Sequence, residues 1–286
     1  MFTIFSCPKD FTGLFGIIQR NAINSWLRLD PLPQILLYGI TDKNVKKEFN
    51  HKNIIHLPIE YINEYGTPYV SEIFLSAKQK SENQTLCYVN SDIILFNDFT
   101  KCINDLKKCN DYFGVGRRYN FEINKIINFK SMNIFENETP FQKKYLDTYT
   151  GSDYYIFDRD LLDNFPKFLI GRTCWDNWLI YNAISRGFKV VDCSSRINCV
   201  HQKHDYSHIK TDTTNHYKGI EREYNYRLLG SANRIYNLKD CNYLFKEDKL
   251  VANLSLDRFI NIAIRNFGLL IIREFLSRLK KNYINL

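Results

Sequence analysis

Polar residues that could bind a cation follow an apolar run near the middle of the chain. Asn90, Ser91 and Asp92 come directly after Leu86–Val89 and precede a second apolar run, Ile93–Leu95. If Leu86–Val89 is a strand of a parallel sheet, these side chains lie beyond its carboxyl end, where open sheets bind ligands. A carboxylate there can hold Mg²⁺ or Mn²⁺, which would neutralise a diphosphate leaving group. The alternative is a turn whose side chains bond the local backbone.

Two further carboxylates lie in sequence surroundings that suit a sugar or its acceptor. Asp153 follows a glycine at the start of an apolar run, and it could bind acceptor hydroxyls or close a turn. Asp176 lies between Trp175 and Trp178, and a carboxylate beside aromatic walls could act as a general base. Asp176 also has capping-box spacing from Thr173, so the alternative is a residue that only caps a helix.

Histidines three and four residues apart form the fourth candidate. His201, His204 and His208 could ligate a metal ion, together with Asp205. By itself this cluster could form the zinc site of a hydrolase. The surrounding stretch His201–His216 is polar throughout, so a surface loop with solvated histidines is the alternative.

The elements that must position these residues alternate between strands and helices. Helices are indicated at Leu14–Trp26, from Thr67 to about Lys80 with Thr67 as N-cap, and at Thr173–Ser185. Strands separated by helices imply crossover connections, so we predict an α/β fold with a mainly parallel, Rossmann-like sheet flanked by helices. The expected strands are Phe2–Ser6, Gln34–Tyr38, Asn53–Leu57, Thr85–Val89, Tyr112–Arg118, Tyr154–Phe157 and Lys189–Cys193.

The end of the chain has a different pattern. From Leu254 it is expected to form one long helix capped by Ser255. We predict a main domain at residues 1–237 and a C-terminal helical extension at 238–286. The helix would pack on the domain or on a second subunit, or lie on an anionic membrane through a basic face. That face carries Arg258, Arg265, Arg273 and Lys280.

The composition limits the classes of protein and partner. The chain has 286 residues, 44% of them hydrophobic, which suits one large domain with an appendage and a full core. Its formal net charge of +8 favours an acidic partner such as a nucleotide diphosphate or an anionic lipid surface. A nucleic acid is not expected, because the lysines are spread along the chain and no RNA-binding or zinc-finger signature is present.

The cysteines and the apolar runs predict a cytoplasmic protein, with peripheral association with a membrane as an alternative. The eight cysteines show no CxxC pair and several lie in apolar runs, as expected for buried free thiols in a reducing compartment. The first residues do not have the pattern of a signal peptide. No apolar run reaches the roughly 18 residues of a membrane span.

In this order, the segments resemble those of the GT-A glycosyltransferases, the nucleotide-diphospho-sugar transferase superfamily. More narrowly, the chain resembles a group of largely uncharacterised GT-A-like proteins with a Pro-bearing loop after the first strand and NSDI, WDNWL and HQxHDYxH segments. The resemblance covers roughly residues 2–230. The residues that carry it are Phe2–Pro8, Gly66-Thr67-Pro68, Asn90–Ile93, Trp175–Leu179 and His201–His208.

The resemblance implies a GT-A fold and transfer of a sugar from a nucleotide-diphospho-sugar donor to a glycan or other hydroxyl acceptor. Asp92 would match the last acidic position of the DxD metal motif, with Asn90 at the first position. His201 or His204 would match the late histidine that completes metal or diphosphate binding. Asp176 would match the carboxylate that acts as base in inverting members.

The remaining donor-site residues are also implied by the resemblance or by charge. Ser6, Cys7 and Pro8 would lie against the nucleotide at the end of the first strand. Thr67 and Ser91 belong to matching segments and would line the same site. Arg117 and its neighbour Arg118 could steady the phosphates.

Three other functions stay open. Asn90 in place of an acidic residue suggests one of them, a GT-A-like module that binds a nucleotide sugar or glycan without turnover. A nucleotidyltransferase is disfavoured because Cys7–Gly16 lacks a Gly-rich loop bearing Arg and Lys. A zinc hydrolase would use the histidine cluster. If Asp176 only caps its helix, a retaining transferase mechanism becomes possible.

Overall fold

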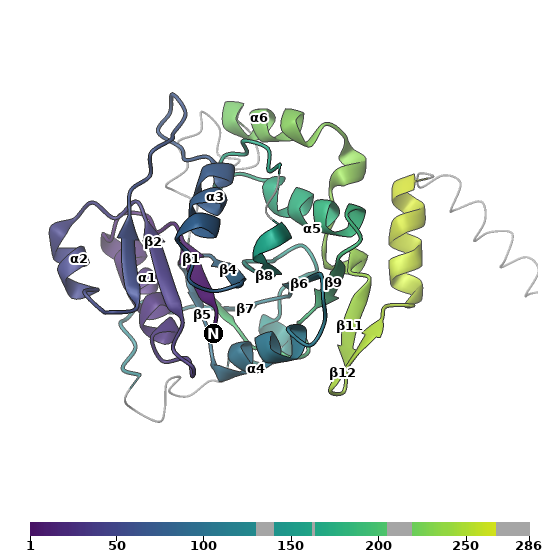
Figure 1. Ribbon diagram of the computed structural model, residues 1–286, viewed down its shortest axis with the longest axis horizontal. Helices are drawn as coiled ribbons and strands as arrows, with labels where there is room; N and C mark the ends of the chain where they lie inside the picture. Colours follow the sequence, from purple (N-terminus) through teal and green to yellow (C-terminus); the bar gives the residue numbers. More distant parts are fainter. Residues whose placement is uncertain (130–139, 162–163, 205–218, 267–286) are drawn as a thin grey trace, which may run out of the picture.

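In a computed structural model, the structure describes residues 1–129, 140–161, 164–204 and 219–266 (Figure 1). Nine strands form one sheet in the order β12-β11-β9-β6-β8-β4-β1-β2-β3. They are β1 (Thr3–Ser6), β2 (Gln34–Tyr38), β3 (Ile54–Leu57), β4 (Thr85–Val89), β6 (Tyr112–Val115), β8 (Tyr154–Asp158), β9 (Lys189–Asp192), β11 (Tyr243–Lys246) and β12 (Lys249–Ala252).

The strand directions confirm the predicted sheet. All eight neighbouring strand pairs have a defined sense: β8 runs antiparallel to β4 and β6, and β12 runs antiparallel to β11, whereas the other five pairs are parallel. A second, three-stranded sheet has the order β5-β10-β7, with β5 (Ile93–Ile94), β7 (Tyr119–Phe121) and β10 (Val200–Gln202).

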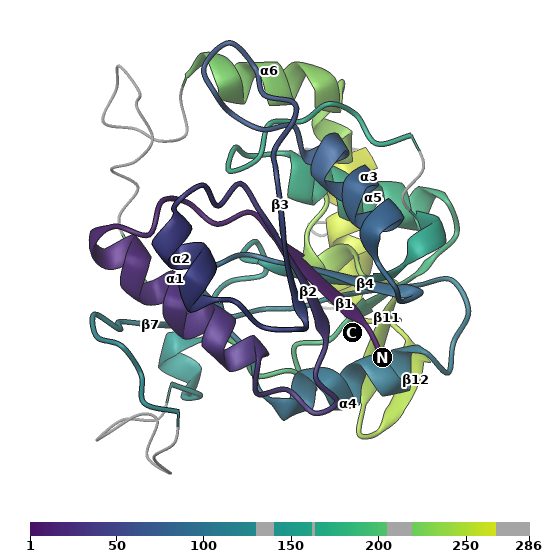
Figure 2. The same ribbon diagram turned by 60° about the vertical axis from the view of Figure 1, so that its left-hand side comes forward.

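Helices cover both faces of the main sheet (Figure 2). α1 (Gly13–Trp26), α2 (Lys43–Glu48) and α4 (Asn97–Leu106) contribute to the core on one face, and α3 (Val70–Lys80) and α5 (Trp175–Ser185) to the core on the other. Side chains of a strand alternate between the two cores, so Ile4 packs on the first and Phe5 on the second. α6 (Ile220–Leu229) follows later in the chain, and there are four 3₁₀ turns among the described residues: Lys143–Tyr145, Arg159–Leu161, Ala232–Arg234 and Leu238–Asp240.

The helix starts differ from the predicted ones. α3 begins at Val70 with Tyr69 as N-cap, and the predicted cap Thr67 instead donates its backbone N–H to the Asn63 Oδ1 at 2.8 Å. α5 begins at Trp175 after Cys174, whose φ of 87° is left-handed. The predicted capping box does not form, because Cys174 rather than Thr173 takes the N-cap position and no side chain bonds there.

The C-terminal extension begins with two strands of the main sheet. β11 pairs in parallel with β9, so the predicted boundary between residues 237 and 238 does not coincide with the end of the sheet. A helix then runs over residues 256–266, and Ser255 Oγ accepts from the Arg258 N–H at 3.3 Å as predicted for its cap. Within the described ranges, no helix has the length and apolar character needed to cross a membrane.

The basic side of this helix faces the domain. Arg265 donates to both carboxylate oxygens of Asp240, at 2.6 and 2.5 Å, and Asp240 is 1% exposed. The Arg265 guanidinium also lies over the Tyr236 ring, 3.8 Å from its centroid. Asn261 and Arg258 donate to Asp240 as well, so this part of the predicted membrane-facing stripe is used in docking the helix. Arg273 and Lys280 lie outside the described residues.

Removing one partner of the buried ion pair between Asp240 and Arg265 is expected to lower the stability strongly. Asp240→Ala leaves the Arg265 charge buried without its partner, so we expect the free energy of unfolding to fall by about 3–5 kcal/mol. Glu223→Ala is the control, because Glu223 and Arg227 form an exposed pair, 67% and 81% accessible, and should change it by less than about 1 kcal/mol. Urea denaturation of both variants checks this, and equal midpoints would contradict it.

Candidate functional site

A cleft of about 370 Å³ opens beyond the carboxyl end of β4. Its volume is in the range of small-molecule sites, and it lies where open α/β sheets bind ligands. Eighteen side chains or backbone segments line it: Cys7, Pro8, Lys9, Ile59, Gly66, Thr67, Pro68, Tyr88, Asn90, Ser91, Asp92, Arg118, Asp153, Ile170, Gly171, Arg172, His201 and His204. Most of the residues predicted to bind a donor and metal are therefore brought together.

The small sheet places two histidines against Asp92. β10 pairs antiparallel with β5, which sets His201 opposite Ile93, directly after Asp92. The Oδ2 of Asp92 lies 3.0 Å from His204 Nε2 and 3.6 Å from His201 Nε2. Possible ligand atoms of the three residues all lie within 4.8 Å of one another, as a shared cation requires. The alternative of a surface loop with solvated histidines is wrong for His201, which is a buried strand residue, 7% exposed.

The protonation of His201 is fixed by Asn120 at the end of β7. His201 Nδ1 lies 2.9 Å from Asn120 Oδ1, and an amide oxygen can only accept, so Nδ1 carries the proton. In the neutral ring, Nε2 then directs its lone pair toward Asp92. Burial lowers the pKa of His201, which favours this neutral form. A lone pair facing a carboxylate is a favourable arrangement only when a cation lies between them.

Asp92 has an oxygen that lacks a partner. Its Oδ1 is buried without a hydrogen bond among the described residues. Burial alone would raise the pKa of Asp92, but His201, His204 and Arg118 outweigh it and hold that pKa well below its usual range. An ionised, buried and unsatisfied carboxylate oxygen is costly unless a cation or donor occupies the site.

Gln202 holds Asp92 in place and was not identified from the sequence. It is fully buried, and it donates to the Asp92 carbonyl from its backbone N–H at 3.2 Å and from its side-chain amide at 3.1 Å. Its Oε1 accepts from Asn21 Nδ2 at 2.9 Å. These bonds tie α1, β10 and the Asn90–Asp92 turn together, so the carboxylate is supported by rigid elements.

Asp153 lines the cleft, but both of its carboxylate oxygens have partners. Asn90 donates its side-chain amide to one of them at 2.7 Å, and Arg118 forms an ion pair with the other. Arg118 also contacts Asp147 at 2.9 Å. Asp153 therefore positions Asn90 and Arg118. Both of its carboxylate oxygens are engaged in these contacts, so it supports the cleft rather than offering an oxygen to an acceptor.

Asp176 lies behind the wall of the cleft rather than in its lining. It occupies the first turn of α5, a few residues after Ile170–Arg172, which do line the cleft. Its Oδ1 is buried and has no hydrogen-bond partner among the described residues. Burial, reinforced by the charge of Asp153, raises the pKa of Asp176 to about 6. A carboxylate with a raised pKa beside a cleft is suited to proton transfer.

The other predicted donor-site residues divide into two groups. Cys7, Pro8, Thr67 and Ser91 line the cleft, and burial raises the pKa of the Cys7 thiol to about 12, so it stays protonated. Ser6 does not reach the cleft, because its hydroxyl is buried and donates to the Val89 carbonyl at 2.6 Å.

Arg117 also lies away from the cleft lining. Its guanidinium stacks on Tyr149, 4.5 Å from the ring centroid. The neighbouring Arg118 lines the cleft in its place, together with Lys9 and Arg172, two cationic residues that the sequence analysis did not select.

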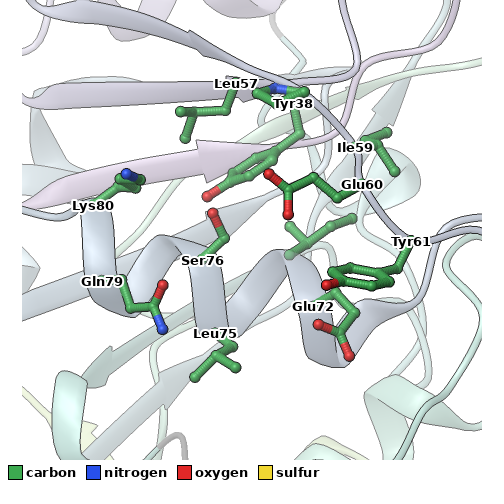
Figure 3. Close-up of a pocket in the computed structure, with 12 residues that line it drawn as sticks. Tyr38, Leu57, Ile59, Glu60, Tyr61, Glu72, Leu75, Ser76, Gln79 and Lys80 are labelled. Carbon is green, nitrogen blue, oxygen red and sulfur yellow. The ribbon is translucent and has the colours of Figure 1, made fainter.

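A second cavity, of about 540 Å³, lies between the edge strand β3 and α3 (Figure 3). Its lining includes Tyr38, Glu60, Tyr61 and Glu72, and it shares only Ile59 with the cleft. None of the predicted site residues lines it. The potential metal ligands of the described residues lie in the cleft, so the chemistry is assigned there.

No protein-family model and no curated protein sequence matches this chain. Solved structures match it in fold. The structure of GalNAc-T7 with UDP, GalNAc and Mn²⁺ is 10% identical to this chain, matches it over 80% of this chain and 48% of its own, and has a TM-score of 0.53. The chain has a GT-A-type fold. It spans about half the length of that protein.

Two other similar structures have lower TM-scores. S. aureus TarS in complex with UDP-GlcNAc is 13% identical over 82% of this chain and 72% of its own, with a TM-score of 0.49. The 4-diphosphocytidyl-2C-methyl-D-erythritol synthase of Anaerococcus prevotii is 15% identical over 79% of this chain and 97% of its own, with a TM-score of 0.41.

Proposed function

We propose that the protein is a metal-dependent glycosyltransferase that moves a sugar from a nucleotide-diphospho-sugar to a hydroxyl acceptor with inversion. One observation carries the proposal: Asp92, His201 and His204 meet in the cleft beyond β4, and Asp92 keeps a buried oxygen to which none of the described residues donates a hydrogen bond. The GT-A-type fold supports it, because the similar GalNAc-T7 structure contains UDP and Mn²⁺.

Asp92, His201 and His204 would hold the cation, and their chemistry fits one. Two imidazole nitrogens with one carboxylate oxygen suit Mn²⁺ better than Mg²⁺, which prefers an all-oxygen shell. When bound, such a cation supplies positive charge to the departing diphosphate.

The arginines of the cleft do not supply this positive charge themselves. Arg118 is compensated by Asp147 and Asp153, and Arg172 by Glu221, which it contacts at 2.5 Å. These arginines can orient phosphate oxygens but bring little net positive charge. Lys9 adds one cation to the lining, but a diphosphate carries more than one negative charge, so its binding is expected to depend on a divalent cation as well.

Asp176 would take the proton of the acceptor hydroxyl. Its pKa of about 6 keeps it largely ionised at neutral pH while leaving it more basic than an ordinary aspartate. The start of α5 lies next to Ile170–Arg172 at the cleft wall, so an acceptor crossing this wall would approach Asp176. A modest side-chain or backbone movement on binding would complete the contact.

Ligand binding and turnover test the proposal in sequence. A thermal-shift screen of UDP-, GDP-, dTDP- and CMP-sugars is run with Mn²⁺ and with EDTA, since a ligand of the folded state raises the melting temperature. We expect one nucleotide class to stabilise the protein only with Mn²⁺, and release of the nucleoside diphosphate when an acceptor is added. Stabilisation by no nucleotide sugar would contradict the proposal.

The hydrogen bond between Asn120 and His201 gives a separate prediction. Asn120→Ala removes the acceptor that holds the proton on His201 Nδ1, so we expect the affinity for Mn²⁺ to fall about 10- to 100-fold. Isothermal titration with MnCl₂ measures it. Asn128→Ala, a change outside the cleft lining, is the control. Unchanged affinity in Asn120→Ala would show that this bond does not orient a ligand.

A binding module without turnover is the second candidate. The observation that favours it is the side chain of Asn90, which replaces an acidic residue of the motif and is engaged with Asp153. Asp176 also stands outside the cleft lining. Mn²⁺-dependent stabilisation by a nucleotide sugar, without diphosphate release across a broad acceptor panel, would favour this function.

A further inference from the structure

We propose that a shallow depression beside the cleft binds neutral sugar residues of a glycan acceptor. This inference rests on the proposed transferase function. The depression has a volume of about 300 Å³ and lies between the loop before α3 and the start of α6. Its lining consists of Asn63, Glu64, Tyr65, Tyr69, Leu169, Ile220, Glu221 and Tyr224.

One tight loop forms a wall of both the depression and the cleft. Asn63 Oδ1 accepts from the backbone N–H groups of Tyr65 at 3.0 Å and Thr67 at 2.8 Å. Gly66, with a φ of 82°, makes the turn between them. Tyr65 lines the depression, whereas Gly66 and Thr67 line the cleft, so the two sites lie on either side of the same turn.

A chain of polar contacts closes the opposite side of this wall. Asn63 donates its side-chain amide to Glu221 Oε1 at 2.8 Å, and Glu221 Oε2 accepts from Arg172 at 2.5 Å. Glu221 lines the depression and Arg172 lines the cleft. The boundary between the sites is therefore held by a charged network, which fixes the distance that a bound acceptor would span.

The depression also lies on the route to the proposed base. Leu169 lines the depression, Ile170–Arg172 line the cleft, and Asp176 follows on the same segment at the start of α5. Leu169 is fixed by Asn225 of α6, which accepts from its N–H at 2.8 Å and donates to its carbonyl at 3.0 Å. A glycan lying in the depression would thus direct its end across this segment toward the reaction centre.

The side chains offer the chemistry of a sugar-binding surface. Tyr65 is 57% exposed, Tyr224 is 37% exposed and Ile220 is 68% exposed, so flat aromatic and apolar faces are open to a ligand. The apolar C–H face of a pyranose ring packs against such surfaces, while tyrosine hydroxyls and Glu64 can bond its hydroxyl groups.

The charges of the depression select against anionic sugars. Arg172 is compensated by Glu221, and Glu64 adds a further carboxylate. Lys167 balances it, with its Nζ 5.9 Å from the centroid of the Tyr69 ring, so a uronic acid or a phosphate group would find no net positive charge there. Neutral residues are therefore the expected occupants.

Binding of defined oligosaccharides tests this inference. The probes are neutral gluco-, manno-, galacto- and N-acetylglucosamine oligosaccharides of one to six residues, and matching uronic acid oligomers. Their dissociation constants are measured by calorimetry, with UDP and MnCl₂ present throughout. We expect binding of at least one neutral series, tighter for oligomers than for the monosaccharide, and about a tenfold loss for each of Tyr65→Ala and Tyr224→Ala, or roughly 1.4 kcal/mol per substitution.

Tyr226→Ala is the matched control. Tyr226 is 48% exposed on the same helix, and its position two residues from Tyr224 places it on another helix face, outside the depression. We expect the affinity of Tyr226→Ala for the neutral oligosaccharides to equal that of the unmodified protein. Tighter binding of the uronic acid oligomers, no binding of any neutral series, or equal losses in Tyr226→Ala and Tyr224→Ala would each overturn the inference.

The same samples separate this inference from the proposed function. All three tyrosines lie outside the cleft lining, so the Mn²⁺-dependent stabilisation by a nucleotide sugar should be unchanged in every variant. If that stabilisation is present but the affinity for glycans is unchanged in Tyr65→Ala and Tyr224→Ala, only the acceptor depression is refuted. If no nucleotide sugar stabilises the unmodified protein, the proposed function fails, whatever the glycan result.

Discussion

Asp92→Asn is expected to lower kcat/KM about a thousandfold and to remove measurable Mn²⁺ binding. Asp92 is the carboxylate of the proposed cation site, and its Oδ2 lies 3.0 Å from His204 Nε2. An amide is a weak ligand without charge, so the charge that stabilises the leaving diphosphate is lost, an effect of several kcal/mol. Diphosphate release and calorimetric titration with MnCl₂ measure the two quantities.

Asp98→Asn is the matched control for this substitution. Asp98 is a partly buried carboxylate on α4, bonded to Asn198 and absent from the cleft lining. We expect it to keep Mn²⁺ affinity and activity within about twofold, because it touches neither ligand nor cation. An Asp92→Asn protein with the same activity and Mn²⁺ response as this control would refute the assigned metal site.

Asp176→Asn is expected to reduce kcat about 10²- to 10⁴-fold, the usual contribution of a general base. The loss should fall on kcat while Mn²⁺ and nucleotide binding stay unchanged, since Asp176 lies outside the metal cluster. In the unmodified protein, activity should fall as the pH drops below about 6, because protonation of Asp176 removes the base. The variant should lack this titration. A variant that keeps the full rate would leave Asp176 with a structural role and reopen a retaining mechanism.

The same substitution should make the protein more stable at alkaline pH. The pKa of Asp176 rises from 3.8 to about 6 on folding, so the folded state binds the proton more tightly and stability is lost as the pH rises through this range. Asp176→Asn avoids that loss, and we expect a gain of about 1–3 kcal/mol at pH 8 that disappears near pH 4. Urea denaturation at the two pH values measures it. An equal effect at both would contradict the raised pKa.

The large elements of the fold were predictable from local patterns. Gln34–Tyr38 and Thr85–Val89 are strands with the predicted bounds, because continuous apolar runs of this length suit buried parallel strands. The approximate place of the cleft follows from the same argument, since polar residues directly after β4 must lie at the carboxyl edge of the sheet.

The details of the site depend on contacts that local patterns do not contain. His201 lies in a three-residue strand whose partners β5 and β7 are about 80 to 110 residues away in sequence. Because the residues that follow His201 in sequence are polar, the local pattern could not predict that it is buried. Arg117 and Arg118 lie between β6 and β7, outside both strands, so no strand periodicity could show that Arg118 lines the cleft and Arg117 does not. Ser6, the last residue of β1, is buried, whereas Cys7 directly after the strand lines the cleft.

The docking of the C-terminal helix also depends on a contact that the local sequence pattern does not contain. A repeat of basic residues predicts a shared face, and the structure agrees for Arg258 and Arg265. The sequence pattern could not reveal that Asp240, buried and 25 residues before Arg265, receives this face. Contact of the extension with a membrane or with a second subunit stays a prediction.

Anomalous diffraction from crystals soaked in MnCl₂ and UDP tests the central claim most directly. We expect a manganese peak in the cleft, within coordination distance of a carboxylate oxygen of Asp92 and of a ring nitrogen each of His201 and His204, with the diphosphate of UDP as a further ligand. A cleft that contains UDP without manganese, or manganese bound elsewhere on the protein, would contradict the account.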